Sequence, residues 1–315
     1  MHWQDKKCRQ RANRCLKLAH QTLKRQEGTE RTMTISYQTF KQKVLKERRF
    51  VHDEEVRQFL DSLAATFSDR IRVLRKGTVL WRAQKGNDYV KLHDGQGEVI
   101  DEVPVPYGKS RMTPDSAKVG SNRANPKGIA YLYLATNPMT AIHEVRPWIG
   151  AVVSVAAFEV LCDLRIVDFS QHSGKSWPGP GFSTKDLRSV IQTAPPTAEE
   201  LTETLLYHVD NAFSRPISRD DEEIEYVPTQ IIAEAVRREC YDGIAYKSAF
   251  SGALKDAFNV ALFEADKSRC ISSCMCDVTG VQVSVDGPYG FGGSTDCPSA
   301  YTEACKAADN GNRSV

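Results

Sequence analysis

The chain has 315 residues, of which 41% are hydrophobic and 26% charged, and its formal net charge is +2. Its length and apolar content are enough for one large domain or two ordinary ones. No run of eighteen apolar residues occurs, and no apolar segment follows the basic N-terminus, so we expect neither a membrane span nor a secretory signal. The expected location is therefore the cytoplasm.

The small net charge hides a basic N-terminal region. Residues 1–50 carry 14 Lys and Arg against 4 Asp and Glu. We interpret them as one or two helices with a solvated basic face, because no nucleic-acid-binding motif is present. Residues 51–75 contain a clearer amphipathic helix with Asp53 as its N-cap. Its apolar positions are Val56, Phe59, Leu60 and Leu63. Residues 1–75 are thus predicted to form a helical N-terminal extension.

From residue 76 to 267 strand and helix patterns alternate, which predicts an α/β or α+β domain. Two helices have clear boundaries. One begins at Pro138 after the capping residue Asn137 and is stopped by Pro147, and the other opens at Thr229. The predicted strands cover residues 78–84, 129–135, 151–160, 243–248 and 259–265.

Two segments fit this alternation poorly. Residues 170–228 contain a Gly/Pro-rich run and an acidic stretch, so we interpret them as an insertion or lid. Residues 268–315 are rich in Cys, Gly and Ser and are predicted to be a tail without regular structure. Five of the nine cysteines lie there, namely Cys270, Cys274, Cys276, Cys297 and Cys305. Their spacing matches no standard zinc motif and no histidine follows His208, so zinc binding is the lesser alternative to an oxidisable tail.

Three arginines are candidate anion ligands. Arg82 interrupts an apolar strand, where a guanidinium needs either a salt-bridge partner or a ligand. Arg111 and Arg123 lie on a long loop rich in proline and glycine. A loop arginine is usually a surface residue, but three arginines near one strand–helix unit are suited to bidentate binding of a diphosphate.

Three further polar residues, each at the end of a predicted strand or helix, are candidate site residues. Tyr133 lies at a strand end, with Tyr131 on the same face and Leu132 and Leu134 on the other. Glu144 is near a helix C-terminus, where the dipole disfavours it, so it is either exposed or has a functional partner. Ser248 ends a strand but lacks the G-x-S-x-G elbow of a hydrolase nucleophile. No dinucleotide-binding or Walker A loop is present.

The chain resembles the RES-domain family over residues 78–266. The stretches that carry the resemblance are LWRAQ, RMTPDSAKVGSNRANPKGIAYLYLATNPMTAIHEVRPW, VSVAAFEV, YVPTQIIAEAV, YDGIAYKSAFSG and NVALFEA. The family implies a compact fold similar to ADP-ribosyltransferase domains, with a mixed sheet and flanking helices. Many members are bacterial toxins that degrade NAD by hydrolysis or phosphorolysis and are neutralised by an antitoxin protein.

The resemblance also implies roles for individual residues. The family's site residues correspond here to Arg82, Arg123, Tyr133, Glu144 and Ser248, and more loosely to Arg111. Glu144 would stabilise oxocarbenium character at the ribose, the arginines would hold the diphosphate, and Tyr133 would position nicotinamide. Ser248 would bind ribose or phosphate. NAD would be the substrate, with no cofactor and no metal.

Two other functions stay open at this point. The same pocket would serve ADP-ribosyl transfer to a macromolecule, because only the acceptor differs. A non-enzymatic nucleic-acid-binding module that uses residues 1–50 ranks third, because it leaves Arg123, Tyr133 and Glu144 unexplained.

Overall fold

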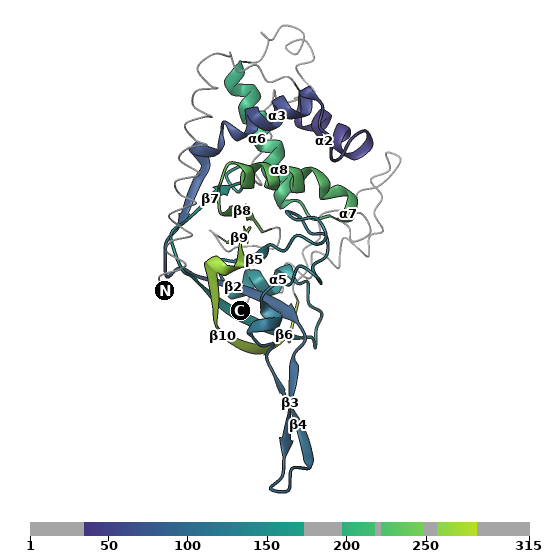
Figure 1. Cartoon of the computed structure of the whole chain (residues 1–315), viewed down its shortest axis with the longest axis vertical. Helices are drawn as coiled ribbons and strands as arrows, with labels where there is room; N and C mark the ends of the chain where they lie inside the picture. The colour runs from purple at the N-terminus through teal and green to yellow at the C-terminus, as the bar shows by residue number, and fades with distance from the viewer. Residues whose placement is uncertain (1–34, 173–196, 218–221, 249–256, 282–315) are drawn as a thin grey trace, which may run out of the picture. The chain divides into compact units, whose positions relative to one another are not determined.

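The computed structural model describes residues 35–172, 197–217, 222–248 and 257–281 (Figure 1). The chain divides into two units, residues 1–278 and 279–315, and the described helices and strands lie in the first. The predictions made for residues 1–34, for residues 173–196 and 218–221 of the predicted insertion, and for Cys297 and Cys305 lie outside the described residues.

Two N-terminal helices begin where the sequence supplies caps. In α2 (Tyr37–Lys46) the Ser36 hydroxyl accepts a hydrogen bond from the Thr39 amide at 3.1 Å. In α3 (Glu54–Ala64) the Asp53 carboxylate accepts one from the Val56 amide at 2.9 Å, which confirms the predicted cap. The four predicted apolar positions of α3 are all buried. Stacked rings of Phe40 and Phe59, with centroids 4.3 Å apart, join the two helices.

The centre of the fold is an eight-stranded mixed sheet, with the order β1-β7-β8-β9-β5-β2-β6-β10. Neighbouring strands are antiparallel except β7 and β8, which are parallel. The strands are β1 (Ile71–Leu74), β2 (Val79–Lys85), β5 (Leu132–Ala135), β6 (Val152–Val160), β7 (Leu164–Asp168), β8 (Gly243–Lys247), β9 (Phe258–Leu262) and β10 (Ser268–Asp277). A mixed sheet with flanking helices is the predicted fold class, which is thus confirmed.

Alternation along the central strands places apolar residues in separate cores on the two sides of the sheet. On β8, Ile244 and Tyr246 belong to the core under the helices, whereas Ala245 belongs to the core on the other side. The helix-side core contains residues of α2, α3, α6 (Ala198–Ser214) and α8 (Val227–Arg238). A Cβ at Gly243 would lie 2.4 Å from the Ala261 carbonyl oxygen, so the approach of β8 to β9 requires glycine there.

Strand β10 corrects the prediction of a structureless tail from residue 268. Its residues pair with β6 from Ser268 opposite Val160 to Asp277 opposite Val152. Because β10 is an edge strand with largely exposed side chains, its Ser- and Cys-rich sequence lacks the aliphatic pattern of a buried strand. Within the described residues, no group of three or more His, Cys, Asp or Glu is arranged to hold a metal ion.

The remaining elements were not predicted. Strands β3 (Asp88–His93) and β4 (Val99–Val105) form a separate hairpin, followed by the short helix α4 (Lys109–Met112). Another short helix, α7 (Glu222–Glu225), precedes α8. Over the described part of the chain, no helix is long and apolar enough to cross a membrane.

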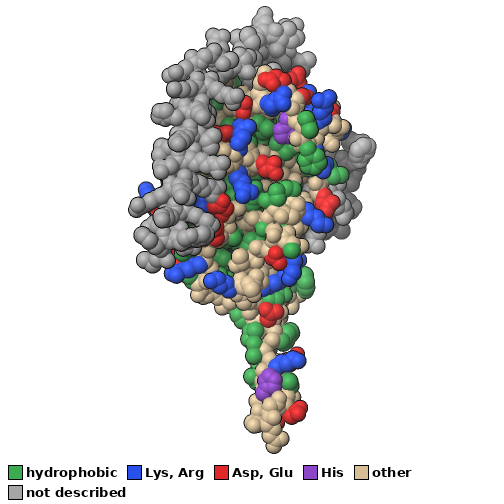
Figure 2. Space-filling model, in the orientation of Figure 1, with side chains coloured by type: hydrophobic (Ala, Val, Ile, Leu, Met, Phe, Trp, Pro, Cys, Tyr) green, Lys and Arg blue, Asp and Glu red, His purple; other side chains and the backbone are tan. Residues whose placement is uncertain are grey.

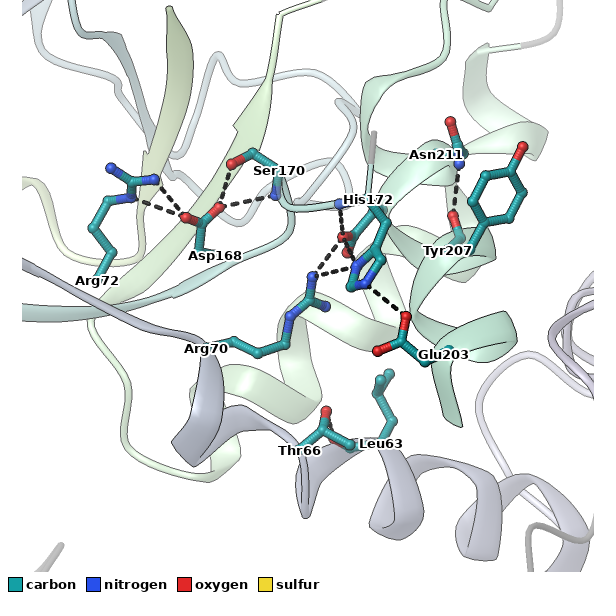
Figure 3. A network of polar contacts seen from close by, with 11 residues as sticks. Leu63, Thr66, Arg70, Arg72, Asp168, Ser170, His172, Glu203, Tyr207 and Asn211 are labelled. Carbon is teal, nitrogen blue, oxygen red and sulfur yellow. Dashed lines mark hydrogen bonds and ion pairs between the residues drawn. The ribbon is translucent and has the colours of Figure 1, made fainter. Parts of the chain in front are cut away.

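A buried ion pair fastens α6 to the sheet (Figure 3). Arg70, at the end of the 3-10 turn Phe67–Arg70, is 3% exposed, and Asp210 of α6 is fully buried. Arg70 Nη2 donates to Asp210 Oδ2 at 2.5 Å, and the backbone amide of His172 donates to the same oxygen at 2.9 Å. Asp210 therefore joins the turn before β1, the segment after β7 and helix α6.

We expect Asp210→Asn to lower the free energy of unfolding by about 2–3 kcal/mol, because the buried Arg70 charge loses its carboxylate. The double variant Arg70→Met, Asp210→Leu should lose less, since it removes both charges. Denaturant titration measures both effects. A single variant as stable as the unmodified protein would show that the pair does not hold α6 in place.

Candidate functional site

A cavity of about 370 Å³ lies beside the sheet, under the end of α6. Its wall is formed by residues of β2, β5, β8 and β9, by helix α5 (Pro138–Glu144), and by the loop that precedes β5. Its volume is within the range of about 300–1,000 Å³ usual for ligand sites. Of the residues predicted for a site, Arg82, Arg123, Tyr133 and Glu144 line this cavity.

Glu144 is held at the cavity by two buried donors. Helix α5 begins as predicted, with Asn137 Oδ1 accepting from the Thr140 amide at 2.8 Å, and it ends at Glu144. Ser248 Oγ and Asn259 Nδ2 donate to Glu144 Oε1 at 2.5 and 2.7 Å. Ser248 and Asn259 are 3% and 4% exposed, whereas Glu144 itself is exposed.

These two contacts explain how a carboxylate is tolerated at the helix C-terminus, where the dipole opposes it. Because both donors use Oε1, the second oxygen, Oε2, receives no hydrogen bond from the described residues. The arrangement fixes the carboxylate from one side and leaves one oxygen available to a ligand.

Arg82 places an unpaired positive charge in the cavity wall. Its Nη1 atom is buried and has no hydrogen-bond partner among the described residues. Burial, with a smaller contribution from the charge of Arg111, lowers the pKa of Arg82 to about 10. A charged group with a buried nitrogen that lacks a partner is costly, so the arrangement favours binding of an anion.

The other two arginines are used differently. Arg123 lines the cavity, but its Nη1 and Nη2 atoms donate to the carbonyl oxygens of Ala212 and Arg215 at the end of α6, both at 2.9 Å. Arg111 is exposed on α4 and is not part of the lining. The structure therefore brings Arg82 and Arg123 together and leaves Arg111 at the side of the site.

Tyr133 has an ordering role in the loop before β5. Its hydroxyl donates to Asn125 Oδ1 at 2.7 Å and accepts from the Ala124 amide at 3.0 Å. Burial raises the pKa of Tyr133 well above its usual range, so the phenol stays neutral. Its ring lines the cavity while its hydroxyl fixes the loop.

Helix α8 fixes the same loop from the other side. Thr229 Oγ1 donates to the Arg123 carbonyl oxygen at 2.6 Å. Gln230 Nε2 donates to the carbonyl oxygens of Asn122 and Asn125 at 2.8 and 3.1 Å. The polar groups of the loop thus mainly make hydrogen bonds that fix its conformation, and this conformation positions Arg123 and Tyr133 at the cavity.

We expect Tyr133→Phe to destabilise the protein by about 1–3 kcal/mol, because Asn125 and the Ala124 amide lose their partner. Tyr131→Phe is the matched control, since the Tyr131 hydroxyl makes neither contact, and it should have a smaller effect. Thermal melts of the two variants side by side measure the difference. Equal losses would contradict the ordering role of Tyr133.

Among the cavity residues that sequence reasoning missed are Asn259, Tyr246 and Arg146. Asn259 precedes an apolar run on β9, and a polar residue at the start of a buried strand was the available signal. Tyr246 is buried on β8, where burial and then the charge of Glu144 raise its pKa well above the usual value. Arg146, with a φ of 47°, has a left-handed backbone that few non-glycine residues adopt, and no sequence pattern indicates this.

Comparison with known proteins gives two findings. The sequence profile of the RES domain matches residues 102–278, which is more than half of the chain. Arg82 lies before the matched range, whereas Arg111, Arg123, Tyr133, Glu144 and Ser248 lie within it. The crystal structure of the M. tuberculosis MbcT–MbcA toxin–antitoxin complex has a chain that is 12% identical, with a TM-score of 0.33. The match covers 68% of this chain and 92% of that one. No curated protein sequence matches.

Proposed function

This chain belongs to the RES-domain family, and from that premise we propose that it is an enzyme that cleaves the nicotinamide–ribose bond of NAD. The observation that carries the proposal is the pairing, in one cavity, of an unpartnered guanidinium with a carboxylate that has one oxygen available. NAD offers a group for each: a diphosphate for the cation and a ribose for the carboxylate.

In this proposal Arg82 binds the diphosphate. Its pKa of about 10 keeps it charged at neutral pH, and the anion supplies the partner that Nη1 lacks. The contribution of Arg123 is smaller, because two of its nitrogens are held by carbonyl oxygens. The aromatic rings of Tyr133 and Tyr246 in the wall provide flat surfaces for nicotinamide.

Glu144 acts on the ribose. When the bond to nicotinamide breaks, both bonding electrons leave with the ring, which departs neutral, and positive charge develops on the ribose. Oε2 of Glu144 stabilises that charge directly or by accepting a hydrogen bond from a ribose hydroxyl. Ser248 and Asn259 act through Glu144 by holding Oε1. Water or phosphate then adds to the ribose carbon and loses a proton.

Product analysis tests the proposal and identifies the acceptor. Incubation with NAD in phosphate-free buffer gives ADP-ribose if water is the acceptor. Added phosphate diverts the product to ADP-ribose-1″-phosphate if the reaction is a phosphorolysis. Attachment of ADP-ribose to protein, with no free product, would instead establish transfer to a macromolecule.

As part of the same proposal, the protein is a toxin that depletes cytoplasmic NAD and is neutralised by an antitoxin protein. Induced expression of the unmodified chain in bacteria should then stop growth and lower the NAD content. The Glu144→Gln variant, expressed to the same level, should do neither. Growth arrest by both variants alike would mean that toxicity does not depend on this cavity.

A further inference from the structure

The β3–β4 hairpin exposes more apolar surface than its own folding explains. It extends away from the large sheet (Figures 1 and 2), and every residue of β3 and all but the last of β4 are exposed. Its large apolar residues are Tyr89, Val90, Leu92, Val99, Ile100 and Val103, with exposed fractions from 38% to 64%. A lone two-stranded hairpin is marginally stable in water, and exposed apolar clusters mark interaction sites.

Local contacts nevertheless hold the hairpin at both ends. At its tip, Asp94 Oδ1 accepts from the amides of Gln96 and Glu98 at 2.8 and 2.9 Å. At its base, Ser154 Oγ of β6 donates to the Gly86 carbonyl oxygen at 2.7 Å and accepts from the Tyr107 amide at 3.0 Å. The hairpin is therefore presented in a defined conformation.

The strand register gives the hairpin two different faces. Val90 lies opposite Val103, and Leu92 lies opposite Asp101, so these side chains share one face. We call Val90, Leu92 and Val103 the aliphatic face. Tyr89 and Lys91, paired with Pro104 and Glu102, point to the other side. The aliphatic face is therefore apolar with two carboxylates, Asp88 and Asp101, on the same side.

The charge of the hairpin indicates what can cover this face. Residues 88–105 contain five carboxylates and one lysine, a net charge of −4 with His93 neutral. A second copy of the hairpin would bring the same negative charge, and an anionic membrane would be repelled as well. A basic partner is attracted instead.

The backbone indicates how the partner binds. Pro104 in β4 lacks an amide hydrogen, which weakens that strand as a pairing edge, whereas β3 contains no proline. The outer edge of β3 can therefore accept another strand, and an added strand that alternates its side chains would place every second one over the same face.

We propose that the hairpin is the docking site for an extended segment of a partner protein in which apolar residues alternate with lysine or arginine. The segment pairs with the edge of β3, its apolar residues extend the aliphatic face, and its basic residues, on the other side of the hairpin, are attracted by the hairpin's net negative charge. This proposal does not depend on the reaction proposed for the cavity.

The test uses the full chain and two fluorescent peptides of about eight residues, the length of an ordinary strand. One alternates valine with lysine, and the other alternates valine with glutamate. Fluorescence anisotropy should show saturable binding of the lysine peptide that weakens as salt rises, and no binding of the glutamate peptide. The variant Leu92→Thr, Val103→Thr should lower the affinity at least tenfold. Tyr89→Thr, on the opposite face, is the matched control and should change it little.

Because Tyr89, Leu92 and Val103 are exposed, the unmodified chain and both variants should have the same melting temperature. The proposal is overturned if the lysine peptide does not bind, if both peptides bind equally, or if the double variant binds as tightly as the unmodified chain. It is also overturned if light scattering finds a dimer of the unmodified chain that the double variant abolishes, since the occupant would then be a second copy.

Discussion

Glu144→Gln is expected to lower the rate of NAD cleavage by about 100- to 1,000-fold, the loss usual when one group that stabilises transition-state charge is removed. Glutamine keeps an oxygen that can accept from Ser248 and Asn259, so the contacts that fix the end of α5 survive. What is lost is the negative charge near the ribose. The melting temperature should therefore change little.

The matched control for this variant is Glu199→Gln, which neutralises an exposed carboxylate on α6 that is not part of the cavity lining. Steady-state rates and thermal melts of both variants separate catalysis from folding. Unchanged turnover in Glu144→Gln would contradict its role in the reaction. A large drop in its melting temperature would show instead that the charge is needed for the fold.

Arg82→Met is expected to weaken NAD binding at least tenfold and, at the same time, to stabilise the protein without substrate. The Arg82 side chain is half-buried and its Nη1 has no partner among the described residues. Desolvation of the charge therefore lowers the stability of the folded protein until a ligand anion binds. Methionine fills similar space without the charge. Each kcal/mol regained would raise the melting temperature by about 2–4 °C.

The stability effect of Arg82→Met should depend on pH. The pKa of Arg82 is lowered to about 10 in the folded protein, so folding favours its neutral form. The cost of the charge is fully present below pH 10 and disappears as the pH rises above that value. The stability gain of Arg82→Met should thus be present at pH 7 and shrink above pH 10. NAD binding by the unmodified protein should fall over the same range, because the cation is lost.

Arg111→Met is the control, because Arg111 is exposed and lies outside the lining. Removing it takes away a neighbouring positive charge, so the pKa of Arg82 should rise while NAD affinity changes much less than in Arg82→Met. Calorimetric titration with NAD measures these affinities. If both arginine variants bind NAD equally well, the diphosphate is not held by Arg82.

Local signals in the sequence were enough to predict the elements that carry the site. The caps at Asp53 and Asn137 predict helix starts because each supplies its own hydrogen bond within three residues. Alternation predicts that Tyr131 and Tyr133 share a face, which the two cores confirm. Such features depend on neighbours along the chain, which a sequence shows directly.

The features that were missed depend on distant partners. Gln230 fixes Asn125 across 105 positions, and Asn259 meets Glu144 across 115. Arg123 donates to carbonyl oxygens about 90 residues away along the chain. No sequence pattern around Arg123 indicates these partners. Strand β10 was not predicted because an edge strand is held by backbone pairing and can lack an apolar pattern. The β3–β4 hairpin was not predicted because its exposed residues do not belong to a core.

The central claim is that one cavity both holds NAD and breaks its nicotinamide–ribose bond. It is tested most directly by following nicotinamide release from NAD by the purified full chain, with Glu144→Gln and Arg82→Met measured beside it. We expect the unmodified protein to release nicotinamide. The rate should fall in Glu144→Gln even at saturating NAD, whereas the lower rate of Arg82→Met should largely recover at higher NAD concentrations. Release that is the same in all three proteins would contradict the central claim.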